Sequence, residues 1–571
     1  MINSKQKHRI LAVTVGLVIL SSVAILQIPN KTELKSLIVQ GTDIASVKVA
    51  VSSVGGEITH ELGIINAVSV KLNNTSLQTL RQHQDILHIY DDSPVELSGK
   101  PSDSSQVSMC EPSSDQYLNT CYPTFTGASA LHSEGITGDG VTVAVLDTGL
   151  WNKSHLIDDS NGYRVLAQYD INKPDKKAES DIHDDSGHGS HVTSIIMSYG
   201  QTTSQLYNGM APEADLVSVR VFDADGQGTY AGVISGIDWL VANKDTYDIR
   251  VLNLSLSAPP KSYYYDDPLN QAVMAAWQAG IVVVASAGNT GPDPMTIGVP
   301  GNVPYVITVG AMTDNYTPDD SGDDVVASFS AAGPTHAGFV KPDMVAPGGH
   351  ILALLDKSGH QLAIDHPEFM EPTYREFFTM SGTSQATAVV TGAVALMLQA
   401  DPSLTPDDVK CRLIDSARTA STRKGKLAYS ILQQGSGMVD AYNAVYSTAI
   451  GCANRGMDIS KDLDNIEHYG GPVNQDEVGN YYLMDPDGGQ YTLWDGSYSQ
   501  STGYIWADGY IWADGYIWAD GYIWADGYIW ANGYIWANSY IWADGYIWAD
   551  SYIWTTNLSE GASINSWVPQ E

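Results

Sequence analysis

The chain has 571 residues, enough for one large folded domain with smaller units beside it. It carries 65 acidic residues against 29 lysines and arginines, for a formal net charge of −36. This excess of negative charge argues against a nucleic-acid partner and is compatible with solubility, salt tolerance or the binding of divalent cations.

The N-terminal 30 residues have the pattern of an export signal. Three cationic residues, Lys5, Lys7 and Arg9, precede an uncharged and mostly apolar run from Ile10 to Ile28. The run is longer than a usual signal core and no small-x-small cleavage site follows it. A cleaved signal and a retained membrane anchor therefore both stay open, and we favour the cleaved signal. The expected location is extracellular, or the cell surface if the segment is retained.

Four cysteines fit an oxidising compartment outside the cytoplasm. Proximity in sequence favours the pairing of Cys110 with Cys121 and of Cys411 with Cys452. We therefore predict two disulfides.

Residues 31–97 have the pattern of a small α+β unit. The runs "IASVKVAVSSV", "NAVSVKL" and "ILHIYDD" are β-like, whereas "TSLQTLRQHQ" is helical. A linker rich in serine, proline and aspartate follows, over residues 98–127.

Residues 128–450 predict an α/β domain with a doubly wound, mostly parallel sheet. β-branched runs such as "GVTVAVLDTG", "IRVLNLSLS" and "AGIVVVASAGN" alternate with helix-like segments such as "LNQAVMAAWQAG". Continuous apolar strands between helices are typical of a sheet that is covered on both faces. A functional site is expected at the carboxyl ends of such strands.

The C-terminal part has three predicted regions. Residues 451–502 are polar and Gly-rich, which indicates a linker or a small C-terminal region; residues 503–557 repeat the hexapeptide YIWADG; residues 558–571 form a tail. The repeats predict a β-rich module, either a meander of short strands or a solenoid. Two roles stay open for it: a spacer whose aromatics pack on one another, or contact with a surface, a polysaccharide or an insoluble substrate.

Four polar motifs lie at predicted strand ends or helix starts. "VAVLDTG" contains Asp147, "SGHGSHV" contains His188 and "GTSQATAVVTG" contains Ser384. Taken singly, they also fit a turn, a polar helix start and a capped helix. Together they supply a hydroxyl, an imidazole to take its proton and a carboxylate to orient the imidazole. In "ASAGNTG", Asn289 can aim an amide N–H at a developing oxyanion.

These motifs resemble those of the subtilisin-like serine peptidases, the subtilase family. The order Asp, His, Ser along the chain is the order found in subtilisin. "AAGPTHAGFVKPDMVAPGG" is similar to the family's segment ahead of the serine. Two residues depart from the commoner pattern: Ser190 stands where Thr is commoner and Gln385 where Met is commoner. The resemblance covers roughly residues 128–445 and implies a subtilisin-like fold.

The resemblance implies a serine-type endopeptidase with Ser384 as its nucleophile. His188 is then the general base and afterwards the acid, and Asp147 orients it. The N–H of Ser384 and the side chain of Asn289 hold the oxyanion. The chemistry requires no cofactor. Relatives commonly bind calcium for structure, but no Asp-x-Asp-x-Asp-Gly loop identifies ligands here, so we name none and expect no catalytic metal.

Three polar neighbours of the predicted triad have structural roles in this interpretation. Ser381 belongs to a turn, Thr383 caps the helix and His191 is structural.

The resemblance also implies two extended edges that clamp a substrate as an added strand. The residues expected to contact substrate are Gly226, Gly228, Ser255, Leu256, Ser257, Ala287 and Gly288. Ser257 stands where many relatives have Gly, which narrows the adjoining pocket. The small Ala287 and Gly288 should still leave room for sizeable apolar side chains.

The unit over residues 31–97 resembles the subtilase pro-segment, through "SSVGGEITHELGIINAVSVKL" and "DILHIYDDSPV". In that family the pro-segment assists folding and blocks the site until it is cut. The resemblance therefore implies an intramolecular inhibitor and a cut between Val95 and Thr126. The other expected partners are protein or peptide substrates.

The leading hypothesis is an exported serine endopeptidase that is activated by removal of its pro-segment. The alternative is a catalytically silent binding or adhesion protein of the cell surface, built on a peptidase fold. A third hypothesis is transfer of the acyl group to an amine, which needs the same triad as hydrolysis.

Overall fold

The computed structural model describes fifteen segments of the chain. They are residues 34–101, 119–153, 156, 158, 162–173, 182–202, 204–317, 322–373, 376–421, 427–475, 480–484, 490–491, 499–500, 516–517 and 522–523. The expected export segment lies outside them. Within the described residues, no helix is long and apolar enough to cross a membrane.

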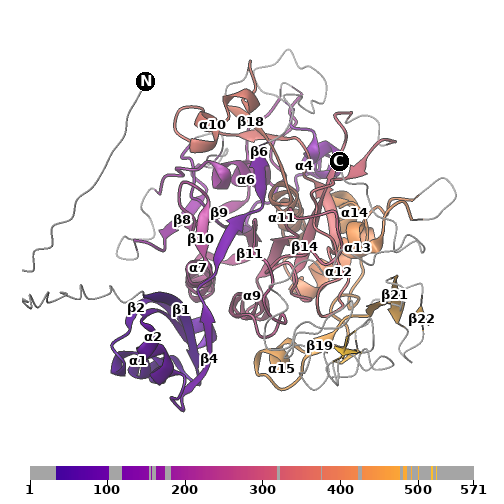
Figure 1. Cartoon of the computed structure of the whole chain (residues 1–571). Coiled ribbons are helices and arrows are strands. Elements are labelled where there is room, and N and C mark those ends of the chain that lie inside the picture. Colours follow the sequence, from indigo (N-terminus) through magenta and orange to yellow (C-terminus); the bar gives the residue numbers. More distant parts are fainter. Residues whose placement is uncertain are drawn as a thin grey trace, which may run out of the picture.

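A mostly parallel sheet lies at the centre of the large domain (Figure 1). Its strand order is β15-β14-β13-β11-β7-β9-β8, with β16 beside β14. The strands are β7 (Thr142–Asp147), β8 (Val165–Asp170), β9 (Asp215–Arg220), β11 (Ile249–Leu254), β13 (Val282–Ser286), β14 (Ile307–Thr313), β15 (Val325–Val326) and β16 (Met344–Pro347). Only the pairing of β14 with β15 is antiparallel in this sheet. The predicted α/β class and mostly parallel sheet are thus confirmed.

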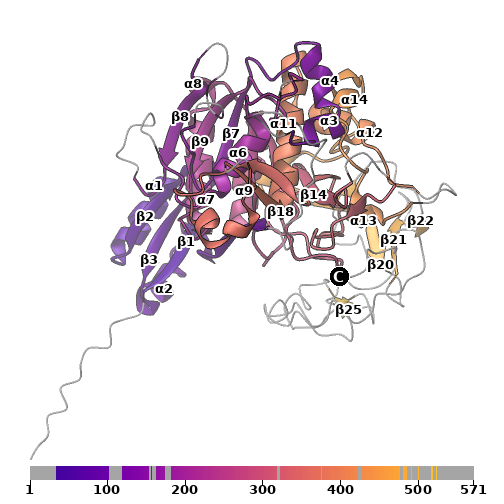
Figure 2. The ribbon, with the colours of Figure 1, turned by 90° about the horizontal axis from the view of Figure 1, so that it is seen from above.

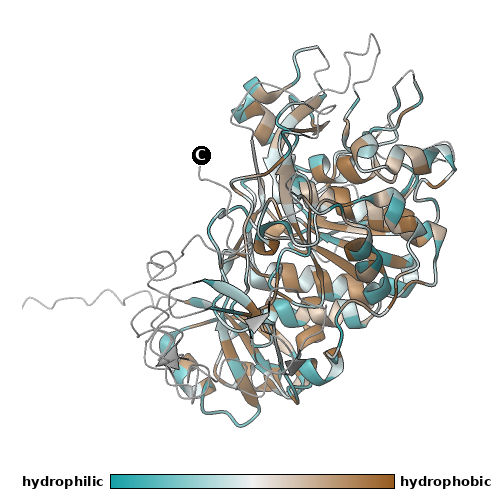
Figure 3. Cartoon of the chain, turned by 90° about the vertical axis from the view of Figure 1, so that its right-hand side faces the viewer, coloured by the Kyte–Doolittle hydropathy of each residue, from teal (hydrophilic) through white to brown (hydrophobic). Residues whose placement is uncertain are grey.

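Helices cover both faces of this sheet. Every residue of β7 and β13 is buried, and successive residues of a strand point to opposite faces. The helices that contact the sheet include α6 (His188–Met197), α7 (Tyr230–Ala242), α9 (Pro268–Gln278) and α11 (Thr383–Ala400). Figure 3 shows the resulting hydrophobic interior around the central strands.

A small antiparallel sheet precedes the large domain, with strand order β2-β3-β1-β4. Its elements are β1 (Lys35–Gly41), α1 (Ile44–Ser53), β2 (Glu57–Leu62), β3 (Ala67–Leu72), α2 (Asn74–Leu80) and β4 (Ile86–Asp91). It has its own apolar core, while Ile38, Leu62, Ile65 and Ala67 of the same unit belong to the core of the large domain. Figure 2 shows this unit at one side of the large domain, with the C-terminal helices at the other.

The prediction of a β-strand at "IASVKVAVSSV" is wrong, because this segment forms α1. The alternation of Val47, Val49 and Val51 is typical of a strand, but Val49 is 69% exposed while Val47 and Val51 are buried. The helix instead buries Val47, Ala50 and Val51, at helical spacing. The Asp43 side chain accepts a hydrogen bond from the N–H of Ser46 and so caps the helix.

Two short strands connect the small sheet to the large domain. They are β5 (Pro94–Leu97) and β6 (Gly99–Pro101). β5 lies between β10 (Gln227–Thr229) and β12 (Leu256–Ser257), and β6 pairs with β18 (Phe377–Gly382). In Figure 1 this connection crosses the large domain from the small sheet to β18.

The remaining elements lie around this frame. They are η1 (Gly63–Ile65), α3 (Tyr122–Phe125), α4 (Ala128–Ser133), α8 (Lys244–Tyr247), β17 (Ile351–Leu354), α10 (Gln361–Asp365), η2 (Pro367–Phe369), α12 (Pro406–Ser416), α13 (Ile431–Gln434), α14 (Ala441–Tyr446), α15 (Ile459–Leu463), β19 (Tyr469–Gly470), β20 (Val473–Gln475), β21 (Tyr481–Met484), β22 (Gln490–Tyr491), β23 (Ser499–Gln500), β24 (Tyr516–Ile517) and β25 (Tyr522–Ile523).

The structure tests one of the two predicted disulfides. Cys411 and Cys452 form a disulfide, as predicted. Cys110 lies outside the described residues, so its pairing with Cys121 stays a prediction. In the repeat region β24 and β25 form an antiparallel pair, and the other repeats lie outside the described residues.

Candidate active site

Asp147 and His188 meet where a strand ends and a helix begins. Asp147 is the last residue of β7 and His188 the first of α6. His188 Nδ1 lies 2.8 Å from Oδ1 and 3.0 Å from Oδ2 of Asp147, and both side chains are buried. The carboxylate can thus hold the proton on Nδ1 and leave Nε2 free to accept one. Among the described residues, Nε2 has no hydrogen-bond partner.

The start of α6 is held by a buried carboxylate, Asp184. Its Oδ1 accepts from the N–H groups of Ser186 and Gly187, at 3.1 and 2.7 Å. Its Oδ2 accepts from the N–H and the hydroxyl of Ser190, at 2.8 and 2.7 Å. Burial works against the charge, but His360 and these hydrogen bonds lower the pKa of Asp184 below its usual value. Asp184 is therefore an anionic cap that positions the helix carrying His188.

Ser384 is the second residue of α11, and its backbone N–H points out of the helix N-terminus. This N–H donates to the carbonyl oxygen of Ser98 at 3.1 Å. The Ser384 hydroxyl donates to the carbonyl oxygen of Ser255 at 3.0 Å. To react, this hydroxyl must turn from Ser255 to Nε2 of His188, an adjustment that is common before a catalytic complex forms.

The carbonyl oxygen of Ser98 lies between two donors. Asn289 Nδ2 donates to it at 2.6 Å, and the N–H of Ser384 donates from the other element. Asn289 follows β13, so a strand end and a helix start provide the two groups. The positive end of α11 adds to the field at this oxygen. Such an arrangement stabilises the negative charge that develops on a carbonyl under nucleophilic attack.

The segment before Ser98 lies in the cleft as an added strand. β5 is antiparallel to both β10 and β12, with Val95 opposite Gly228 and Leu97 opposite Leu256. The N–H of Ser98 donates to the carbonyl of Ser255 at 3.2 Å. This is the backbone geometry of a peptide bound by strand addition.

The other residues expected to contact substrate lie along the same cleft. Glu96 is opposite Ser257 in β12. Gly226 has φ +73°, and a Cβ there would lie 2.8 Å from Cδ1 of Leu97. Gly288 has φ +106° and precedes Asn289, while Ala287 is buried. Gly226, Gly228, Ser255, Leu256 and Ser257 thus lie against β5 or Ser98, Gly288 lies beside Ser257, and Ala287 packs with Ile297 and Ala331.

Four residues that sequence reasoning did not place in the site hold its residues in position through hydrogen bonds. They are Asp184, Asn253, Thr383 and Thr391. Thr391 Oγ1 donates to Asn253 Oδ1, and Asn253 Nδ2 donates to Ser255 Oγ, both at 2.9 Å. Ser255 Oγ donates to the carbonyl of Ser384 at 3.1 Å. This series of buried hydrogen bonds holds the segment 255–257, which pairs with β5, against α11.

Comparison with known proteins agrees with this geometry. Residues 138–456, more than half of the chain, match the model of the family described as "Subtilase family" (Peptidase_S8).

The chain belongs to the subtilase family.

Its relatives include two peptidases of Bacillus subtilis (strain 168). Serine protease AprX is 42% identical over 284 residues, which are 49% of this chain and 61% of that protein. Subtilisin E is 29% identical over 377 residues, which are 65% of this chain and 81% of that protein. These matches confirm the prediction of a subtilase serine endopeptidase, a hydrolase whose substrates are proteins.

A solved structure shares the fold. It is fervidolysin from Fervidobacterium pennivorans, a keratinolytic enzyme related to subtilisin. The TM-score is 0.57 at 21% sequence identity, and the match covers 83% of this chain and 68% of that chain. At this identity the likeness shows the subtilisin-like fold alone.

The second histidine of the subtilase histidine motif is buried behind the site. His191 Nε2 lies 3.1 Å from the carbonyl oxygen of Phe378. Burial lowers the pKa of His191 to about 3, with a smaller contribution from His188. His191 is therefore neutral at ordinary pH and ties α6 to β18.

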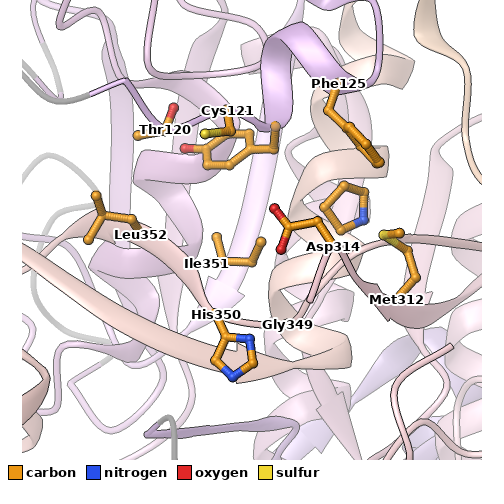
Figure 4. Close-up of a pocket in the computed structure, with 11 residues that line it drawn as sticks. Thr120, Cys121, Phe125, Met312, Asp314, Gly349, His350, Ile351 and Leu352 are labelled. Atoms are coloured by element: carbon orange, nitrogen blue, oxygen red, sulfur yellow. The ribbon is translucent and has the colours of Figure 1, made fainter. Parts of the chain in front are cut away.

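Two cavities of this subtilase differ in their relation to the site. One, of about 260 Å³, opens beside His188 and is lined by Leu97, Leu362 and the carboxylates of Asp225 and Asp365 among others. The second is lined by side chains that include Cys121, Asp314 and His350 (Figure 4). Its volume of about 20 Å³ holds about one water molecule, so it is too small for a substrate.

The expectation of structural calcium stays a prediction. In the part of the chain that the structure describes, no three or more His, Cys, Asp or Glu side chains are placed to hold a metal ion.

Proposed function

We propose that this subtilase is an exported endopeptidase that activates itself by cutting its own chain between Ser98 and Gly99. The observation that carries the proposal is the position of the Ser98 carbonyl oxygen, between Asn289 Nδ2 and the N–H of Ser384. A carbonyl held in this way is the one that the neighbouring hydroxyl attacks.

The backbone on both sides of this bond is held in the cleft. Before the bond, β5 pairs with β10 and β12. After it, β6 pairs with β18, with Gly99 opposite Gly382 and Lys100 opposite Ser381. A peptide fixed on both sides of one bond has lost most of the freedom that opposes reaction, which favours cleavage at that bond.

The reaction follows from the positions of three side chains. Ser384 Oγ attacks the carbonyl carbon of Ser98 while His188 Nε2 takes its proton, and Asp147 stabilises the imidazolium. Asn289 and the Ser384 N–H hold the oxyanion. His188 then gives the proton to the departing amine of Gly99, which leaves Ser98 as an ester on Ser384. Water releases Ser98 by the same steps.

Contacts outside the cleft support a role for the small unit as an inhibitor after the cut. The N–H groups of Gly63 and Ile64 donate to the two carboxylate oxygens of Asp238 on α7, at 2.8 and 3.1 Å. Gln40 donates to Gln271 on α9 at 2.8 Å. These contacts do not depend on the Ser98–Gly99 bond, so the cut unit can stay bound with its new C-terminus in the cleft.

Further parts of the proposal come from the sequence. They are export, residence outside the cell or at its surface, structural calcium, and contact of the repeat tail with a surface or polysaccharide. The domain limits given above belong to the same proposal.

The test is export of the wild-type chain and of Ser384→Ala, with the intact masses and N-terminal sequences of the products. We expect the wild type to be cut into a fragment that ends at Ser98 and one that begins at Gly99, and Ser384→Ala to stay joined across that bond. Ser381→Ala is the matched control, because its hydroxyl is nearby and instead accepts from the N–H of His350.

Two outcomes contradict the proposal. If neither chain is cut, the enzyme does not process itself, and the silent binding protein becomes the better interpretation. If both chains are cut alike, another protease performs the processing.

A further inference from the structure

We propose that the pocket for the side chain before the cut bond, the S1 pocket, is short and polar and selects small hydroxylated residues, serine above all. Ser286 recognises the hydroxyl and Ser257 limits the depth of the pocket. The inference rests on the proposed function, because it takes Ser98 as the residue before the cut bond.

The Ser98 side chain shows where this pocket lies. Its backbone is fixed on one side by Ser255 and on the other by Asn289. Its side chain therefore enters between the segments 255–257 and 286–289. Ser98 is only 2% exposed, so the pocket encloses it.

A buried hydroxyl faces the Ser98 side chain inside the pocket. The hydroxyls of Ser286 and Ser98 share a hydrogen bond of 2.9 Å, and Ser286 is fully buried. The Ser286 hydroxyl is also 2.7 Å from the carbonyl oxygen of Leu256. When its single proton points to Leu256, the hydroxyl of Ser98 supplies the proton that the two serines share. Ser286 then acts as an acceptor, so a substrate side chain with a hydrogen-bond donor at this position binds more favourably than one without it.

Ser257 fills the space that two glycines leave open. A Cβ on Gly298 would lie 1.9 Å from Ser257 Oγ, and a Cβ on Gly288 would lie 2.9 Å from it. Gly288 belongs to one wall of the pocket and Ser257 to the other, so the Ser257 side chain occupies part of the gap between the walls. This packing favours small side chains, in contrast to the expectation of room for sizeable apolar ones.

The size of each effect follows from its cause. Replacement of serine by alanine in the substrate loses one hydrogen bond, while Ser286 keeps its bond to Leu256, so we expect a loss of about three- to tenfold in kcat/KM. An aromatic side chain must displace Ser257, and overpacking of a tight site costs about tenfold or more.

The test uses the purified, processed enzyme and peptide amides of sequence Val-Glu-Leu-X with a chromogenic leaving group. The first three residues copy Val95, Glu96 and Leu97. With X as Ser, Ala or Phe, we expect kcat/KM to fall in that order. In the Ser286→Ala enzyme, kcat/KM for the peptide with X as Ser should be about equal to that for the peptide with X as Ala. In the Ser257→Gly enzyme, kcat/KM for the peptide with X as Phe should rise about tenfold relative to that for the peptide with X as Ala. Ser218→Ala, a buried serine of β9, is the matched control and should keep the wild-type ratios.

The outcomes separate the two proposals. Cleavage with a preference for Phe, or a Ser to Ala ratio that Ser286→Ala leaves unchanged, overturns the assignment of the pocket while the peptidase function stands. No cleavage of any peptide overturns the proposed function, and this assignment with it. If a variant fails to fold, the three substrates with the wild type still decide the order of preference.

Discussion

Thr383 holds the Asn289 amide in the orientation that places its N–H on the carbonyl oxygen of Ser98. Asn289 Oδ1 accepts from the N–H of Thr383 at 3.0 Å and from its hydroxyl at 2.9 Å. The same hydroxyl accepts from the N–H of Gly288 at 3.2 Å. With Oδ1 fixed in this way, Nδ2 must point to Ser98, so the oxyanion donor is set before the substrate reacts.

We expect Thr383→Val to lower kcat about tenfold while KM changes little, because valine keeps the shape but loses the hydroxyl that fixes the amide. Asn289→Ala, which removes the donor itself, should cost about 10²–10³ in kcat, the size known for such a donor in a subtilisin. Steady-state kinetics on a peptide amide measure both variants. Thr383→Ser keeps the hydroxyl and should restore kcat; a Thr383→Val enzyme as fast as the wild type would contradict the positioning role.

Asp184 offers a second test of positioning. Asp184→Asn keeps one oxygen for Ser186 and Gly187 but places an NH₂ group against the N–H of Ser190. A donor that faces a donor in a buried site should lower the free energy of unfolding by about 1–3 kcal/mol. Thermal unfolding in the Ser384→Ala background measures this without self-digestion.

The matched control for Asp184→Asn is Asp185→Asn. Asp185 is half exposed and pairs with Arg220 at 2.8 Å, so its loss should cost less than about 1 kcal/mol. Equal shifts for the two variants would show that Asp184 does not hold the start of α6.

Sequence alone could predict the strands and helices that carry the triad. The motifs around Asp147, His188 and Ser384 each combine a continuous apolar run with a polar end, and the family pattern gives their roles. Such signals are local, so no knowledge of distant contacts is needed. The small unit was harder, because the alternating valines of α1 fit a strand as well as a helix.

The cut site and the supporting residues needed the structure. The sequence limited the expected cut to the stretch between Val95 and Thr126, whereas the pairing of β5 with strands far along the chain supports the proposal of one bond, Ser98–Gly99. Asp184 and Thr383 look like ordinary turn and cap residues in sequence. Their roles depend on where the side chains of Ser190 and Asn289 lie in space.

The Cys411–Cys452 disulfide should stabilise the C-terminal side of the large domain. It links two residues that are 41 positions apart in the sequence, and its removal by Cys411→Ala with Cys452→Ala should cost about 2–4 kcal/mol. The disulfide lies beside a contact of two neighbouring residues, since Lys410 precedes Cys411 and its buried ammonium donates to Oδ1 of Asn454, two residues after Cys452, at 3.3 Å.

Thermal unfolding of Ser384→Ala chains, with and without the two cysteines, measures this effect. A reducing agent should lower the Tm of the parent at least to that of the untreated variant without Cys411 and Cys452. A further fall of the variant under reduction would report the predicted second disulfide, between Cys110 and Cys121. An unchanged Tm on removal of Cys411 and Cys452 would contradict a stabilising role.

His191 should make the fold sensitive to acid. Its pKa is lowered to about 3 by burial, whereas a histidine in the unfolded chain titrates near 6.5. A lowered pKa means that the unfolded chain binds the proton first. The stability that neutral His191 supports is thus present above pH 6.5 and is lost as the pH falls from about 6.5 to 3, at about 1.4 kcal/mol per pH unit.

We expect His191→Gln to reduce by one the number of protons that the chain takes up on unfolding in acid, because glutamine does not titrate. Its NH₂ group can still donate to the carbonyl of Phe378. The measurement is the Tm of Ser384→Ala and of Ser384→Ala with His191→Gln, between pH 3 and pH 7. At pH 7 the Tm of the His191→Gln variant should be lower than that of its parent. Its Tm should fall less between pH 7 and pH 3, so that the two curves of Tm against pH converge. His366→Gln, at a 42% exposed side chain, controls for the loss of any histidine. Parallel curves for the His191 variant and its parent would show that His191 does not carry this acid sensitivity.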